Sequence, residues 1–185
     1  MVRTPSLLTI GVSFLLIGAQ VTASAQTVES PVYLSWARVP VGTQVVQKSV
    51  TTAADGNQIE SKTIQKLKSI DEATAVIEQT YIDPTGEEFV QVFRERRRVP
   101  LLPGVDPQKV GRPRDAKAKG EEMIELAGRS FKAEWYDTTG QAEAGTMLVR
   151  TWFSDEVPGL ILKVVTQIEN RPGSTTIELV DLILP

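Results

Sequence analysis

The stretch GTQVVQKSVTTAADGNQIESKTIQKLKSI, residues 42–70, decides the fold class of this chain. Its first part, 42–52, is rich in Val and Thr, and β-branched side chains favour strands. Asp55-Gly56-Asn57 follows, which is a strong signal for a tight turn between two strands. The remaining part, 58–70, alternates polar and apolar side chains and has few features specific to a helix. The stretch therefore predicts a β-hairpin.

The strand pattern continues along the rest of the chain. Residues 73–82 are rich in β-branched side chains, the sequence Asp-Pro-Thr-Gly at 83–86 predicts a turn, and 87–99 predicts another strand. Residues 42–99 thus predict a meander of four antiparallel strands. Further strands are expected over 120–126, 129–137, 146–153, 160–169 and 175–184, with a tight loop at 154–159.

About nine strands, without an amphipathic helix of three turns, indicate the all-β class. A flat sheet of this size would leave one face wet and both edges open. We therefore predict a strongly curved antiparallel sheet, or half-barrel, of about nine strands with little helix. Residues 26–185 would form this single β-rich domain. Four prolines and many charges fall within 99–119, and we expect this Pro-rich basic segment to be a long exposed connection.

Residues 1–25 have the features of a secretory signal peptide. Arg3 gives a positive start, an apolar run covers 7–19, and Ala23-Ser24-Ala25 has the small-x-small pattern that signal peptidase cleaves. The run is short for the roughly 30 Å of hydrocarbon in a bilayer, although an uncleaved anchor is the alternative. We expect cleavage after Ala25, a secreted or periplasmic location, and no transmembrane segment in the processed chain.

The composition excludes the commonest catalytic and metal-binding chemistry. The 185 residues contain no Cys and no His. Disulfides, thiol nucleophiles, the commonest general base and the commonest transition-metal ligand are therefore absent. A Ca²⁺ site would need about six to eight oxygen ligands, and no loop has that spacing. We predict a protein that is not an enzyme, with no catalytic residues, no cofactor and no metal.

Basic residues gather in one segment of an otherwise acidic chain. Residues 94–119 hold nine Lys and Arg against three acids, whereas residues 26–185 as a whole hold 19 basic and 23 acidic residues. Nucleic acid is not an expected partner, because the net charge is negative and no nucleic-acid motif occurs. One interpretation is a solvated sheet edge that charge protects from aggregation. The other is a binding surface for an anionic envelope component, formed by Arg94, Arg96, Arg98, Arg112 and Arg114.

Large aromatic side chains are the candidate core of the second half. Phe131 and Trp135 share one face of the strand predicted at 129–137, because side chains alternate along a strand. Trp152 lies near the end of the next strand. We expect all three to fill the core of the curved sheet, and the alternative is that some of them line a ligand cavity.

Two short stretches resemble a known group of proteins. Residues 152–160, WFSDEVPGL, place a Ser-Asp turn and Val-Pro-Gly between two strands, and 120–135 contains the spacing Gly128-x-x-Phe131-x-Ala133-x-Trp135. Both resemble small secreted bacterial proteins of unknown function that are related to the lipoprotein-localisation-factor-like fold. The resemblance implies a curved antiparallel sheet that closes over an apolar cavity. It also implies helices that cover the concave face, and this chain shows no good signal for such a lid helix.

The sequence leaves two hypotheses for function open. The first is a non-enzymatic secreted or periplasmic β-rich protein that binds a lipid, another apolar or amphipathic ligand, or a cell-envelope partner. The alternative is a structural or interaction subunit without a small-molecule site, which engages an anionic partner through residues 94–119. An apolar concavity of about 300 Å³ or more would favour the first hypothesis, and an interior filled by side chains would favour the second.

Overall fold

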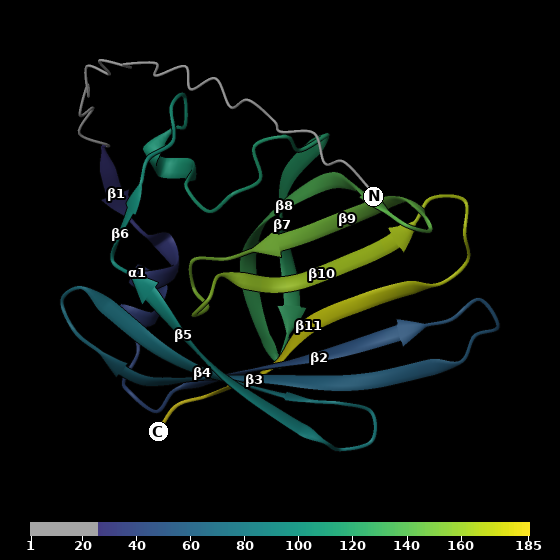
Figure 1. The fold of residues 1–185 in the computed structure, drawn as a ribbon, viewed down its shortest axis with the longest axis horizontal. Coiled ribbons are helices and arrows are strands. Elements are labelled where there is room, and N and C mark those ends of the chain that lie inside the picture. Colours follow the sequence, from purple (N-terminus) through teal and green to yellow (C-terminus); the bar gives the residue numbers. More distant parts are fainter. Residues whose placement is uncertain (1–25) are drawn as a thin grey trace, which may run out of the picture.

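The structure is a computed structural model that describes residues 26–185, so the predicted signal peptide lies outside the described residues. These residues form a large antiparallel sheet, a small two-stranded sheet, one α-helix and one 3-10 turn (Figure 1). No helix among them has the length and apolar character needed to cross a membrane. The strands are β1 (Thr27–Glu29), β2 (Gln44–Thr52), β3 (Gln58–Ile70), β4 (Thr74–Ile82), β5 (Glu88–Arg96), β6 (Arg98–Pro100), β7 (Ala118–Leu126), β8 (Arg129–Ala142), β9 (Gly145–Phe153), β10 (Ile161–Ile168) and β11 (Ser174–Ile183); the helix is α1 (Pro31–Ala37) and the 3-10 turn is Pro107–Lys109.

The large sheet has nine strands in the order β5-β4-β3-β2-β11-β10-β9-β8-β7, and all neighbours are antiparallel. The β2–β11 ladder joins its two meanders and pairs Thr52 with Ser174. The sheet is open, with β5 and β7 at its ends, but it curls so far that β7 also contacts β11. Figure 1 shows β7 and β8 crossing β2 and β3 steeply. The predicted all-β class and curved half-barrel are confirmed.

The strand predicted over 87–99 is interrupted at Arg97. The Arg97 N–H donates to the Ala73 carbonyl (2.7 Å), but the Arg97 carbonyl accepts from the Ser30 N–H (2.7 Å) instead of continuing the ladder with β4. The Arg97 guanidinium also pairs with Glu29 at 2.8 Å. The chain therefore leaves the large sheet, and β6 pairs with β1. This small sheet accounts for the two strands beyond the nine predicted.

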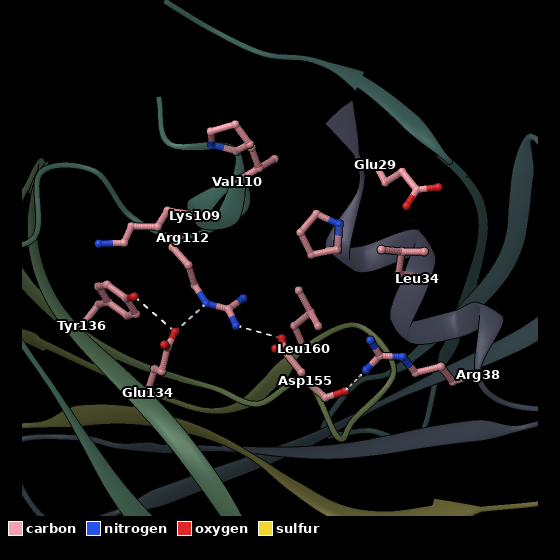
Figure 2. A pocket seen from close by; sticks show the side chains of 12 residues that line it. Glu29, Leu34, Arg38, Lys109, Val110, Arg112, Glu134, Tyr136, Asp155 and Leu160 are labelled. Atoms are coloured by element: carbon pink, nitrogen blue, oxygen red, sulfur yellow. Dashed lines mark hydrogen bonds and ion pairs between the residues drawn. The ribbon is translucent and has the colours of Figure 1, made fainter. Parts of the chain in front are cut away.

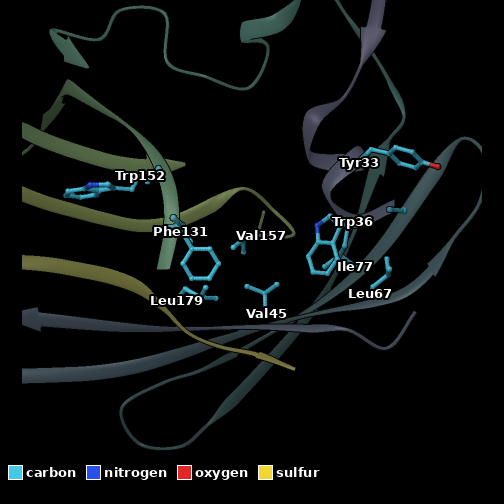
Figure 3. Packing of buried hydrophobic residues seen from close by; sticks show 12 residues of the cluster. Tyr33, Trp36, Val45, Leu67, Ile77, Phe131, Trp152, Val157 and Leu179 are labelled. Carbon is cyan, nitrogen blue, oxygen red and sulfur yellow. The ribbon is translucent and has the colours of Figure 1, made fainter. Parts of the chain in front are cut away.

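A short helix, which the sequence analysis did not predict, fills the inside of the sheet. Ser30 caps α1, since its Oγ accepts from the Tyr33 N–H (3.3 Å), and Pro31 occupies the first turn, where a missing N–H costs nothing. Trp36 is 1% exposed and Tyr33 is 5% exposed. Both belong to the hydrophobic cluster that also contains Leu67 and Ile77, and Figure 3 shows Trp36 next to these two residues.

One hydrophobic cluster joins α1 to both halves of the sheet. It extends from Leu67 and Ile77 on β3 and β4 to Phe131 on β8 and Leu179 on β11. Val157, from the loop between β9 and β10, is fully buried between these groups (Figure 3). The interior of the half-barrel is thus packed with side chains, which counts against a ligand cavity inside the curved sheet and, for that face, favours the second hypothesis. The cavities lie around this core.

Trp36→Ala should lower the free energy of unfolding by about 3–5 kcal/mol, because it leaves a large void in the core. Val41→Ala is a suitable control, since Val41 follows the helix by four residues, is half exposed, and its truncation should change stability by less than about 0.5 kcal/mol. Denaturant unfolding of both variants measures the difference. Equal midpoints for the two variants would contradict the packing described.

Candidate functional site

The five arginines singled out from the sequence do not share one solvated surface. Arg94 and Arg96 are exposed on β5, and Arg98 is exposed on β6, where its Nη1 donates to Thr27 Oγ1. Arg114 is exposed in the connection. The Arg112 side chain, in contrast, is only 9% exposed.

Arg112 is held by carboxylates from two distant parts of the chain. Its Nε donates to Glu134 Oε2 on β8 at 3.0 Å, and its Nη2 donates to Asp155 Oδ1 in the β9–β10 loop at 3.0 Å. The guanidinium also lies over the Phe153 ring, 4.8 Å from its centroid. These contacts tie the Pro-rich connection to the sheet.

One nitrogen of this guanidinium lacks an acceptor. Arg112 Nη1 is buried and has no hydrogen-bond partner among the described residues. Leaving a buried donor unpaired costs about 1–3 kcal/mol, and more when the group is charged. A molecule that presented an oxygen to Nη1 would recover this free energy.

A cavity of about 370 Å³ lies beside Arg112, between α1, the connection and β8 (Figure 2). Pro31 and Leu34 of α1, Val110 of the connection and Leu160 provide apolar wall. The charged lining side chains balance, with three basic and three acidic residues: Arg38, Lys109, Arg112, Glu29, Glu134 and Asp155.

The polar end of the cavity is organised by a short hydrogen-bond chain. The Tyr136 hydroxyl donates to Glu134 Oε2 at 3.2 Å, and the same oxygen accepts from Arg112. Burial, reinforced by the neighbouring Glu134 charge, raises the pKa of Tyr136, so the hydroxyl stays protonated and remains a donor. Arg38 Nη1 donates to the Asp155 carbonyl at 3.0 Å, which fixes the opposite wall.

The aromatic residues chosen from the sequence lie in or beside the core. Phe131 is 1% exposed inside the main cluster, whereas Trp135 is only partly buried at its border. Trp152 is 9% exposed and its indole N–H donates to the Glu122 carboxylate. Trp135 also packs tightly on β7, because a Cβ at Gly120 would lie 2.7 Å from its ring.

A second cavity of about 560 Å³ lies over β8–β10 and is lined by Trp152. Arg150 lies beside it, 4.3 Å from the centroid of the Trp135 ring. Two hydrogen bonds, of 2.6 and 2.7 Å, join this guanidinium to the Asp137 carboxylate, and they lower the pKa of Asp137. The Arg150 charge is therefore compensated within the protein.

The sequence pointed to Arg112 but not to the two carboxylates that hold it or to the tyrosine that bonds one of them. Glu134, Tyr136 and Asp155 come from strand and loop positions with no distinctive spacing relative to residue 112. Arg38 carried no signal either, because the helix that positions it was not predicted. Among residues 26–185, no group of three or more Asp and Glu side chains could hold a metal ion.

Comparisons with known proteins give no family assignment. No protein-family model and no curated protein matches this chain. Similar solved structures include a candidate lipoprotein from Parabacteroides distasonis (13% identity, 78% of this chain and 96% of that chain, TM-score 0.49). Another is a candidate exported protein with a YmcC-like fold from Bacteroides fragilis (10% identity, 78% and 97%, TM-score 0.48). A third is a candidate outer-membrane lipoprotein-sorting domain from Vibrio parahaemolyticus (9% identity, 83% and 90%, TM-score 0.27).

These are lipoprotein-type and exported proteins, the group to which the sequence resemblance pointed. Their TM-scores all lie below 0.5, so we base no conclusion about this chain on them.

Asp137→Asn should lower stability at neutral pH and flatten its acid dependence. The folded pKa of Asp137 is depressed by Arg150, so the pair contributes stability above the unfolded pKa of about 3.9 and loses it as the pH falls through the folded value. Urea midpoints measured from about pH 7 to about pH 3 should fall less steeply in the variant than in the wild type. Glu143→Gln, an exposed acid in the β8–β9 turn, is the control and should leave the slope unchanged.

Proposed function

We propose that this chain is a non-enzymatic, secreted or periplasmic protein that binds an amphipathic ligand in the cavity beside Arg112. The observation that carries the proposal is the buried Nη1 without an acceptor, next to a cavity of about 370 Å³. Cavities that take small ligands start at about 300 Å³ and combine apolar walls with a few polar groups.

The lining indicates what kind of polar group the ligand presents. Glu134 and Asp155 already offset the Arg112 charge, and the remaining lining charges, Arg38, Lys109 and Glu29, add one net positive charge. The cavity as a whole is therefore balanced, which favours a neutral or zwitterionic polar end over a strongly anionic one. The ligand would place a carbonyl or hydroxyl oxygen on Arg112 Nη1, and its apolar part would lie against Leu34 and Val110.

Arg112→Gln should abolish retention of this ligand, because it removes the donor. The measurement is native mass spectrometry of the protein purified from its own envelope, where a bound molecule gives a discrete added mass. Arg114→Gln, an exposed change two residues away, should retain the added mass. Val110→Asn tests the apolar wall independently and should also weaken retention. Circular dichroism identifies any variant that is unfolded.

A wild-type protein without an added mass would contradict the proposal, as would an added mass that survives in folded Arg112→Gln protein.

A second candidate function is contact with an anionic envelope component through the exposed arginines. Arg96, Arg98 and Arg114 are exposed and make no ion pair with other residues of 26–185. Near an anionic bilayer each basic residue contributes about 1 kcal/mol. This interaction would be separate from the cavity, because Arg112 is buried.

Changing Arg96, Arg98 and Arg114 together to Gln should weaken binding to anionic vesicles by about a hundredfold. Cosedimentation with anionic and neutral vesicles at two salt concentrations measures this effect. The wild-type protein should bind anionic vesicles more tightly, and less so at the higher salt concentration. If vesicle binding does not change with salt concentration, with lipid charge or in the triple variant, these arginines only solvate the surface.

A further inference from the structure

β5 is an exposed border strand with apolar side chains on both faces. It lies at one end of the large sheet, and no described strand pairs with its outer edge (Figure 1). The exposed fractions are 52% for Phe89, 61% for Val90, 55% for Val92 and 37% for Phe93. An edge of this kind is a template for pairing with another strand, unless charge, a bulge or a covering element protects it. The β4–β5 ladder has no bulge.

The sequence of β5 is complementary to itself in the antiparallel direction. Residues 89–93 read Phe-Val-Gln-Val-Phe, which is the same from either end, and oppositely charged Glu88 and Arg94 flank them. Neither of these two makes an ion pair with another residue of 26–185.

The backbone of β5 presents the groups that such pairing needs. Arg97 N–H donates to Ala73 O at the end of the β4–β5 ladder, and hydrogen-bonding groups alternate between the two edges of an antiparallel strand. The odd-numbered residues therefore direct their N–H and C=O groups at β4. The even-numbered residues, including Val90 and Val92, direct theirs at the free edge.

We propose that β5 pairs with β5 of a second copy of this chain, antiparallel, about a two-fold axis at Gln91. Val90 then faces the partner's Val92, and the two exchange backbone hydrogen bonds. Glu88 faces the partner's Arg94 in an ion pair, which the two-fold axis repeats. The large sheets of the two copies become one continuous sheet.

On the opposite face of the joined strands, the facing side chains are aromatic. Phe89 faces the partner's Phe93, and aromatic pairs opposite one another stabilise antiparallel strands. Tyr81 on β4 already lies beside Phe89, with ring centroids 6.3 Å apart, and extends this cluster. A two-fold axis at Val92 would also satisfy the backbone, but it would set Phe89 against Glu95 and Val90 against Arg94. The axis at Gln91 instead pairs valine with valine, phenylalanine with phenylalanine, and Glu88 with the partner's Arg94.

Because the chain has no Cys, a single introduced thiol reports the pairing directly. In the proposed register Gln91 faces the partner's Gln91 as a pair without hydrogen bonds, with Cα atoms about 4.5 Å apart, within the range of a disulfide. Gln91→Cys should therefore form a covalent dimer under mild oxidation. Val92→Cys, one residue away, should cross-link far less. Cross-linking of Val92→Cys in preference to Gln91→Cys would overturn the proposed axis.

A charge swap tests the flanking pair without introducing a thiol. The full chain should sediment at twice the chain mass that mass spectrometry gives for the same sample. Glu88→Arg and Arg94→Glu, each alone, turn both symmetric ion pairs into like-charge pairs, and each should raise the dimer dissociation constant by roughly tenfold or more. The double variant carries both changes and should restore the dimer. A wild-type chain that remains monomeric up to about millimolar concentration, or a double variant no tighter than the singles, would overturn the proposal.

Discussion

An open, curved sheet can bury its inner face only if something fills the space inside the curve, and the Trp36 indole does so here. The helix that carries it is anchored at Ser35, whose Oγ accepts from the Gly159 N–H at 2.9 Å. That contact fixes the β9–β10 loop against α1 and so places Asp155 within reach of Arg112. Leu34 on this helix and Arg38 at its C-terminal cap line the cavity. The candidate site therefore depends on how α1 packs into the sheet.

A buried guanidinium imposes a second constraint, this time on the connection. A Pro-rich segment has few backbone hydrogen bonds to hold it on a sheet. Arg112 holds it by side-chain contacts, since Glu134 and Asp155 come from elements that the core already fixes. Glu134 and Asp155 together offset the Arg112 charge, yet the buried Nη1, beside the cavity, has no acceptor among the described residues. Arg112 thus both holds the Pro-rich connection on the sheet and supplies the hydrogen-bond donor of the candidate site.

The hairpins could be predicted from the sequence because their signals are local. The strand expected over 58–70 coincides with β3, since the Asp55-Gly56-Asn57 turn sets its start and the stretch read as polar–apolar alternation ends with it at Ile70. α1 was missed because seven residues are too few for a helical period to show, although Ser30-Pro31 is a recognisable start. The burial of Arg112 could not be read from a charged, proline-rich segment. Its partners lie at residues 134 and 155, and only the sheet order brings them to it.

The ladder between β2 and β11 has a consequence for how the chain acquires its structure. Each meander can form from contacts between sequence neighbours, but Thr52 meets Ser174 only after the long intervening chain has been ordered or looped out. Closing so large a loop costs conformational entropy before any contact compensates for it, and topologies dominated by such pairings fold slowly. The β2–β11 ladder at the centre of the sheet therefore cannot form until β11 has been synthesised. Until then the N-terminal meander has a formed set of local hairpins, but the edge of β2 that pairs with β11 is exposed.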